Sequence, residues 1–158
     1  MSVARKLVSL RSFYRFLVHI GSIEHNPVPR GRIFSMKVDK RLPVFLDKKE
    51  VDRLMDTPDP TKPLGLRDRA ILEILYSTGV RLSELAMMDM DDIDFESREI
   101  TVCGKGSKER IVLIGRPALK ALEHYLRDSR PFIERILNKA LFLNRYGERL
   151  SRRSIEKV

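Results

Sequence analysis

The sequence predicts a mainly α-helical protein with one small, three-stranded antiparallel β-sheet, which is an α+β fold. Apolar residues recur at helical spacing in several separate segments. Short runs with strand-like apolar residues, separated by turn residues, lie together in the middle of the chain. With 158 residues, 42% of them hydrophobic and 34% charged, the chain has room for one ordinary domain and a small appendage. This composition excludes a globally disordered protein.

The first predicted element is an amphipathic helix over residues 3–20. Its apolar positions are Leu7, Leu10, Phe13, Tyr14, Leu17 and Ile20, and a stripe of Arg11, Arg15 and His19 adjoins them. A single helix cannot bury its own apolar face, so we expect packing partners that precede this segment and lie outside the chain. After Gly21, the prolines and basic residues of 26–46 predict an extended, positively charged linker.

Three helices are predicted at the start of a second domain. Asp47 and Glu50 form a capping-box pattern before a short helix that Pro58 ends. A second helix is predicted over 66–77, with Gly79 as its C-cap, and a third over 83–88.

An antiparallel meander is predicted next, with strands around 93–95, 100–102 and 111–113. GKGSK connects the last two strands, and Ile111 and Leu113 are the apolar residues of the third. Beyond the meander, Pro117 opens an amphipathic helix, and residues 140–143 predict a brief buried strand. Ser151 is the expected cap of a last helix.

The net charge of +9 is distributed unevenly. Residues 1–46 hold nine Lys and Arg against two acids, residues 47–103 eight against fourteen, and residues 104–158 fourteen against six. Two basic segments that flank an acidic one indicate a polyanion held from two sides, as by a clamp on nucleic acid. A solvated surface of uneven charge is the alternative.

Cysteine content and hydropathy exclude other classes. The single cysteine, Cys103, excludes an intramolecular disulfide and a cysteine-rich zinc site. No apolar run approaches the roughly 18 residues typical of a membrane span. These features fit a cytoplasmic protein without membrane contact.

The segment TGVRLSEL places Arg81 at the start of a predicted helix, directly after Gly79 and Val80. A guanidinium stays charged and can donate two parallel hydrogen bonds to phosphate oxygens, so it suits charge stabilisation in phosphoryl transfer. Glu84, three residues on, could hold this guanidinium. In isolation, the motif is more typical of an exposed arginine paired with a surface glutamate.

The segment GKGSKER places Lys105 at the tip of the predicted hairpin, between two glycines. A lysine there could reach into a DNA groove and give a proton to a departing oxygen, which an arginine does poorly. Lys108 and Arg110 beside it are candidate phosphate contacts. The alternative is a hairpin whose lysines only keep a sheet edge soluble.

Together, TGVRLSEL and GKGSKER resemble the catalytic domain of tyrosine recombinases, especially the bacterial Xer-type recombinases and related phage integrases. The lysine follows the arginine by 24 residues, and the intervening DMDDIDFESREITV fits the family's order of helix, strand, turn and hairpin. SLRSFYRFLVHIGSIEHNP resembles the last helix of the family's core-binding domain, and RLPVFLDKKEV resembles the segment that leads into the catalytic domain.

The resemblance implies three parts and a DNA partner. Residues 1–25 would be the last helix of a truncated, SAM-like core-binding domain, 26–46 a basic linker, and 47–158 the N-terminal part of a truncated catalytic domain. The family forms a C-shaped clamp around double-stranded DNA and acts as a tetramer, in some cases with a partner recombinase. A tyrosine attacks the scissile phosphate and forms a 3′-phosphotyrosyl bond, with no metal and no cofactor.

By resemblance, Arg81 is the first catalytic arginine, Lys105 the general acid, and Glu84 the residue that supports the arginine. The expected DNA contacts are Lys108, Arg110, Arg11 and Arg15. The family's second arginine and nucleophilic tyrosine are expected beyond Val158, because none of the four tyrosines here has the nucleophile's sequence context. We therefore expect DNA binding without cleavage by this chain. The alternative is a non-catalytic DNA-binding paralogue or regulator of the same fold.

Overall fold

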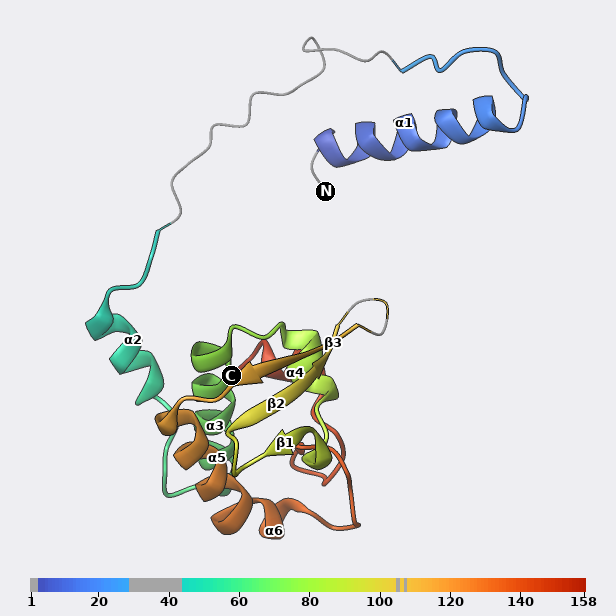
Figure 1. Cartoon of the computed structure of the whole chain (residues 1–158). Coiled ribbons are helices and arrows are strands. Elements are labelled where there is room, and N and C mark those ends of the chain that lie inside the picture. The colour runs from blue at the N-terminus through green and yellow to red at the C-terminus, as the bar shows by residue number, and fades with distance from the viewer. Residues whose placement is uncertain (1–2, 29–43, 105, 107) are drawn as a thin grey trace. The chain divides into compact units, whose positions relative to one another are not determined.

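The computed structural model describes residues 3–28, 44–104, 106 and 108–158 (Figure 1). The chain divides into two compact units, Met1–Phe45 and Leu46–Val158, and each is described by itself. The second unit combines helices with one three-stranded sheet, so the predicted fold class is confirmed. Within the described residues, no helix combines the length and apolarity that crossing a membrane requires.

The first unit contains helix α1, Val3–His19, which confirms the predicted amphipathic helix to within one residue at its end. Gly21 follows in the left-handed conformation, with φ 72°. The Asn26 side chain then donates a hydrogen bond to the Arg11 carbonyl at 3.1 Å and ties the turn back onto the helix. Most of the predicted linker, residues 29–43, lies outside the described residues.

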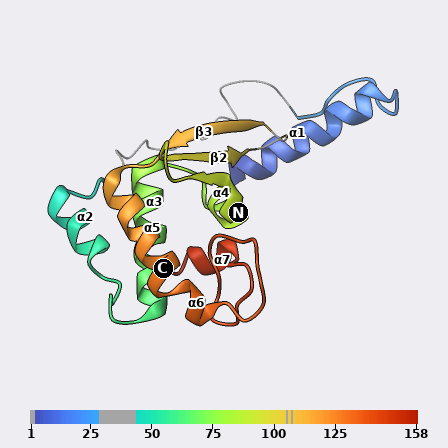
Figure 2. The same ribbon diagram turned by 60° about the horizontal axis from the view of Figure 1, so that its bottom comes forward.

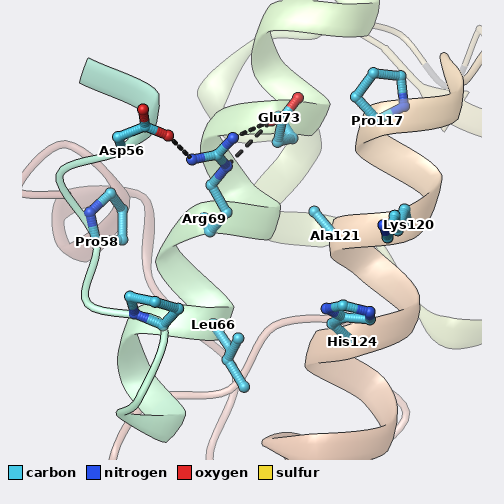
Figure 3. A pocket seen from close by; sticks show the side chains of 10 residues that line it. Asp56, Pro58, Leu66, Arg69, Glu73, Pro117, Lys120, Ala121 and His124 are labelled. Atoms are coloured by element: carbon cyan, nitrogen blue, oxygen red, sulfur yellow. Dashed lines mark hydrogen bonds and ion pairs between the residues drawn. The ribbon is translucent and has the colours of Figure 1, made fainter. Parts of the chain in front are cut away.

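Helix α2, Lys48–Met55, begins with the predicted capping box. The Asp47 amide donates to Glu50 Oε2 and the Glu50 amide donates to Asp47 Oδ1, each at 2.8 Å. Arg69 of the next helix fastens α2, because its guanidinium binds the Met55 carbonyl at 2.5 Å and Asp56 at 2.7 Å. Figure 3 shows this guanidinium between Asp56 and Glu73, beside a groove of about 490 Å³.

Helices α3, Pro63–Thr78, and α5, Arg116–Asp128, form the centre of the second unit and pack against each other (Figures 1 and 2). They run antiparallel, because the start of each helix is hydrogen-bonded near the end of the other. The Gly115 amide, before α5, donates to Ser77 Oγ near the end of α3 at 2.8 Å. Ser129, after α5, donates to the Pro63 carbonyl at the start of α3 at 2.6 Å.

Helix α3 starts three residues before the predicted boundary, because Pro63 occupies its first turn, where the missing N–H costs no hydrogen bond. Gly79 ends it in the left-handed conformation, with φ 62°, and donates its amide to the Leu75 carbonyl. The predicted C-cap is thus confirmed. Helix α4, Leu82–Met87, follows after three residues, and the 3₁₀ turn η2, Met90–Asp92, comes next.

The sheet has the predicted meander topology, with order β1-β2-β3 and antiparallel pairing throughout. Its strands are β1, Ile93–Asp94, β2, Glu99–Cys103, and β3, Glu109–Leu113. The apolar residues of β3, Ile111 and Leu113, do not face the core, because they are 63% and 68% exposed. Val112 faces the core instead, opposite the fully buried Ile100.

The segment after α5 contains the short helix α6, Arg130–Ile133, which the sequence did not predict, and α7, Arg152–Ile155, which Ser151 caps as predicted. Residues 140–143 are buried, but they pair only through isolated bridges, Asp89 with Ala140 and Leu143 with Arg149. The prediction of a strand here was wrong. Side chains hold this segment together with single backbone bonds, such as those from the Leu141 amide to the Met88 carbonyl and from the Leu150 amide to the Phe142 carbonyl.

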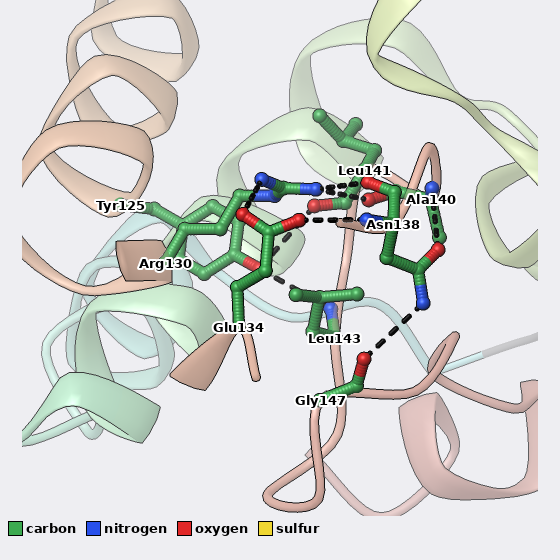
Figure 4. Close-up of polar contacts among 8 residues, drawn as sticks. All are labelled: Tyr125, Arg130, Glu134, Asn138, Ala140, Leu141, Leu143 and Gly147. Carbon is green, nitrogen blue, oxygen red and sulfur yellow. Dashed lines mark hydrogen bonds and ion pairs between the residues drawn. The ribbon is translucent and has the colours of Figure 1, made fainter. Parts of the chain in front are cut away.

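Figure 4 shows these side chains. The Tyr125 hydroxyl donates to the Leu141 carbonyl and accepts from the Leu143 amide, both at 3.2 Å. Arg130 donates to the Asn138 and Ala140 carbonyls and to Glu134. The core that these contacts complete combines residues from α3, α4, the sheet, α5 and the buried segment, among them Ile71, Ile74, Leu85, Ile100, Val102, Leu122, Leu141 and Leu143.

Gly79→Ala is expected to lower the free energy of unfolding by about 1 kcal/mol, because a residue with a Cβ pays that much in the left-handed region. The added methyl group would meet no atom within 4 Å, so the loss reports the backbone conformation alone. Urea unfolding measures it. Gly79→Asn is the control and should lose less, because asparagine tolerates this conformation. Equal stability of Gly79→Ala and the parent would contradict the left-handed cap.

Candidate functional site

Arg81 is placed by the turn between α3 and α4. Gly79 ends α3 and Val80 is buried, so the next residue becomes the N-cap of α4, with φ −72° and ψ 149°. Its amide donates to Glu84 Oε2 at 2.8 Å, and its Nη1 donates to Glu84 Oε1 at 2.7 Å. The predicted i,i+3 contact is confirmed. The Arg81 side chain remains 72% exposed, so its charge faces solvent.

Glu84 is the buried centre of the site, with a side chain only 4% exposed. A second arginine, Arg110 of β3, approaches it from the sheet. Arg110 Nη1 donates to Oε1 and Nη2 donates to Oε2, both at 2.9 Å, in a two-armed contact. Glu84 therefore holds two arginines that lie 29 residues apart in the sequence.

The strand register explains why Arg110 reaches Glu84. Directly opposite residues of an antiparallel pair share one face of the sheet. Arg110 lies opposite Val102, which is 1% exposed and belongs to the core. Its side chain therefore leaves the sheet on the face that covers the core, toward α4.

Both arginines keep Glu84 ionised. The hydrogen bonds from Arg110, followed by the backbone N–H of Arg81, lower the pKa of Glu84 from 4.5 to about 2 despite burial. The same contact raises the pKa of Arg110. Two guanidinium groups and one carboxylate leave the cluster with a net positive charge at neutral pH.

A hollow of about 640 Å³ opens beside this cluster. It is lined by Arg81, Ser83, Glu84, Met87, Cys103, Gly104, Lys108, Glu109 and Arg110. The Gly104 amide donates to the Lys108 carbonyl at 2.8 Å and closes the base of the β2–β3 hairpin. The hollow can accept an anionic group against an exposed, fixed guanidinium.

The structure brings together Arg81, Glu84, Lys108 and Arg110 of the predicted site. Lys105 lies outside the described residues, as does Ser107. Arg11 and Arg15 belong to the other unit, on α1. The contact between Arg110 and Glu84 was not predicted from the sequence. Its signal was the spacing of two residues from Arg110 to Val112, which places both side chains on one face of a strand.

Two aspartates next to the site have local structural partners. Asp92 Oδ2 accepts the Asp89 amide at 2.8 Å, and Asp94 Oδ1 accepts the amides of Glu96 and Ser97 at 2.9 and 3.0 Å. These bonds make Asp92 a cap of η2 and Asp94 a turn residue, which are common roles of aspartate.

Comparison with known families identifies residues 44–158 as matching the phage integrase family model. The tyrosine recombinase XerC of Pelotomaculum thermopropionicum is 46% identical over 162 residues, which cover 99% of this chain and 52% of that protein. The tyrosine recombinase XerD of Listeria innocua is 42% identical over 159 residues, which cover 99% of this chain and 53% of that protein. The chain thus spans about half the length of the curated relatives it matches.

Solved structures show the same fold. The XerA recombinase aligns with a TM-score of 0.62 and 26% identity over 99% of this chain and 51% of that one. The XerH recombinase in a post-cleavage complex with its palindromic difH substrate aligns with a TM-score of 0.58 and 26% identity, over 72% of this chain and 33% of that one. The Tn1549 transposon integrase bound to transposon right end DNA aligns with a TM-score of 0.73 over 93% of this chain and 52% of that one. At 18% identity, this is a likeness of fold alone.

Proposed function

Because the chain belongs to the phage integrase family, whose Xer-type tyrosine recombinases it resembles over nearly its whole length, we propose that it acts in site-specific DNA recombination. In this proposal, the hollow beside Arg81 receives the scissile phosphate of a DNA duplex. The observation that carries it is the Arg81 guanidinium, which buried Glu84 fixes in place and which is nevertheless 72% exposed. Such a group is oriented for an anion before the anion arrives.

The proposed chemistry is a phosphoryl transfer in which a tyrosine oxygen forms a bond to phosphorus and the bond to the 5′ oxygen breaks. Arg81 stabilises the added negative charge on the non-bridging oxygens. Lys105 gives its proton to the departing 5′ oxygen, which leaves as a hydroxyl. The energy of the cleaved bond is kept in the 3′-phosphotyrosyl linkage, so rejoining needs no further energy source.

We propose that the nucleophilic tyrosine is not one of the four in this chain. Tyr125 is fully buried, its hydroxyl is bonded to two backbone groups, and burial raises its pKa to about 12. A buried, doubly bonded phenol cannot reach a DNA phosphate. The chain alone is expected to bind DNA without forming a covalent complex.

The proposed DNA surface extends beyond the hollow. Lys108 lies at the hairpin base and lines the hollow, and we propose that it contacts an adjacent phosphate. Arg11 and Arg15 on α1 are proposed to contact the duplex from the other unit, as in a clamp. We further propose that the protein acts in the cytoplasm and within a recombinase tetramer, with or without a partner recombinase.

Titration of the chain with a radiolabelled duplex tests the DNA partner. Binding is expected to weaken steeply between about 50 and 200 mM salt, because each phosphate contact releases counterions. Arg81→Gln should weaken binding and reduce the salt slope by about one, whereas Arg127→Gln, an exposed arginine on α5 far along the chain from the site, should change neither. Binding that does not respond to salt would contradict the proposal.

A nicked duplex that traps covalent intermediates tests the second part of the proposal. We expect the chain to bind this duplex and to yield no adduct that survives denaturation. A covalent adduct would show that one of the tyrosines present, Tyr14, Tyr76, Tyr125 or Tyr146, is a nucleophile.

A further inference from the structure

We propose that Arg110 is a positioning residue that acts through Glu84, holding the Arg81 guanidinium in place and fastening the β2–β3 hairpin to α4. The sequence had indicated a direct phosphate contact for Arg110. Its two terminal nitrogens both bind the Glu84 carboxylate instead, at 2.9 Å each. The inference rests on the proposed function in one respect, which is that Arg81 receives a phosphate.

The bonding pattern of Glu84 shows how the positioning works. Each carboxylate oxygen accepts one bond from each arginine: Oε1 from the side chains of both, Oε2 from the Arg110 side chain and the Arg81 amide. Arg110 binds both oxygens at once, so the carboxylate stays directed at Arg81 Nη1 while the exposed part of the Arg81 guanidinium contacts an anion. Glu84 then stays in place and continues to cap the first turn of α4 through the Arg81 amide.

Exposure distinguishes the two arginines. The Arg81 side chain is 72% exposed, whereas that of Arg110 is 41% exposed and that of Glu84 only 4%. The more sheltered contact is thus the two-armed one between Arg110 and Glu84. A planar, bidentate pair of this kind fixes orientation, which a single flexible contact does not.

The hairpin base is packed against the same ion pair. A Cβ atom built on Gly104 would lie 3.5 Å from Glu84 Oε1 and 3.8 Å from Arg110 Nη1. The Gly104 amide donates to the Lys108 carbonyl at 2.8 Å and closes the hairpin at this point. One carboxylate therefore connects the N-terminus of α4, through Arg110, to strand β3 beside the base of the hairpin.

Amide hydrogen exchange on the free chain tests the contact without DNA. Arg110→Gln is expected to accelerate exchange at the Arg81 and Gly104 amides by about tenfold while leaving the α5 core amide of Leu122 unchanged. Arg110→Lys should give an intermediate acceleration, because one ammonium cannot span both oxygens. Arg127→Gln, the matched arginine control on α5, should change none of these amides.

The effects of substituting Arg110 and Glu84 on the exchange rate of the Arg81 amide should not multiply. In a Glu84→Gln background, Arg110→Gln is expected to add less than about twofold to exchange at the Arg81 amide. Independent, multiplying effects would overturn the proposal. So would unchanged exchange at both amides in Arg110→Gln, or an equal acceleration at Leu122, which would show global destabilisation in place of local positioning.

DNA binding supplies a measurement that a purely structural role would leave unchanged. Arg110→Gln should weaken duplex binding, and this loss should vanish in an Arg81→Gln background, because Arg110 acts through Arg81. A direct phosphate contact would lose the same factor in both backgrounds and would lower the salt slope by about one, which would overturn the proposal. If the chain binds no DNA, the recombination proposal fails, and the exchange experiment still decides the role of Arg110 within the cluster.

Discussion

Arg130→Met is expected to lower the free energy of unfolding by about 3 kcal/mol, because it removes one partner of a sheltered ion pair and leaves the other uncompensated. The Arg130 and Glu134 side chains are 11% and 19% exposed and pair at 2.6 Å. The same guanidinium donates hydrogen bonds to the Asn138 carbonyl at 2.5 Å and to the Ala140 carbonyl at 3.2 Å. Methionine matches the volume but donates no hydrogen bond.

Urea unfolding at neutral pH measures this loss. Arg127→Met is the control, because Arg127 is 69% exposed and pairs only with its neighbour Asp128 among the contacts of the described residues. Its replacement should leave the midpoint unchanged. The double variant Arg130→Met with Glu134→Met should recover part of the loss, because no buried charge then remains. A single Arg130→Met variant as stable as the parent would contradict the network.

The consequence extends to the candidate site, because the segment that Arg130 holds supports α4. The Leu141 amide donates to the Met88 carbonyl at 2.9 Å, directly after α4, and the Met90 amide donates to the Lys139 carbonyl at 2.8 Å. Arg149 adds bonds to the Ala86 and Met88 carbonyls. We therefore expect Arg130→Met also to weaken any binding that depends on Arg81.

Features coded by neighbouring residues could be predicted from the sequence. The capping box at Asp47, the left-handed Gly79 and the contact from Arg81 to Glu84 each involve residues at most a few positions apart. Side-chain oxygens and glycine conformations determine them without help from the rest of the fold. The order of strands in the meander followed from alternation and turns for the same reason.

Features that depend on distant partners could not be predicted. Ile111 and Leu113 are apolar but exposed, so apolar character alone does not identify the core face of β3, which the pairing of Arg110 with Val102 shows. Residues 140–143 are apolar enough for a strand, yet their partners are isolated backbone groups, a tyrosine hydroxyl and an arginine, all distant in the sequence. Nothing local identifies such partners.

The candidate site shows the same division. Arg81 and Glu84 came from one short motif, whereas the bond from Arg110 spans 26 residues and requires the sheet register. The basic residues of the hairpin were expected to contact DNA, but the sequence did not say which of them face α4. A register prediction that treated Val102 as buried would have placed Arg110 there.

Glu84→Gln is expected to lower the free energy of unfolding by up to about 2 kcal/mol at neutral pH, after allowance for the solvent exposure of its arginine partners. The substitution keeps the shape of the side chain but removes the charge that both arginines bind. It also turns an amide group toward at least one guanidinium, so a donor faces a donor. Chemical unfolding of parent and variant over a range of pH measures the difference.

The pH dependence follows from the lowered pKa of Glu84. Its pKa is about 2 in the folded chain against 4.5 for an unperturbed glutamate, so folding favours the ionised form. The stabilisation is complete above about pH 4.5 and is lost as the pH falls toward 2, where the folded carboxylate takes up a proton. The parent should therefore approach the Glu84→Gln variant in stability at the acid end.

Glu123→Gln is the matched control, because Glu123 is an exposed carboxylate on α5. At pH 7 its free energy of unfolding should equal that of the parent. If the Glu84→Gln variant differed from the parent by the same amount at pH 2 and pH 7, its effect would be one of shape and not of charge. The ion pair with Arg110 would then not be what stabilises α4 against the sheet, and Arg81 would have to be held by its backbone turn alone.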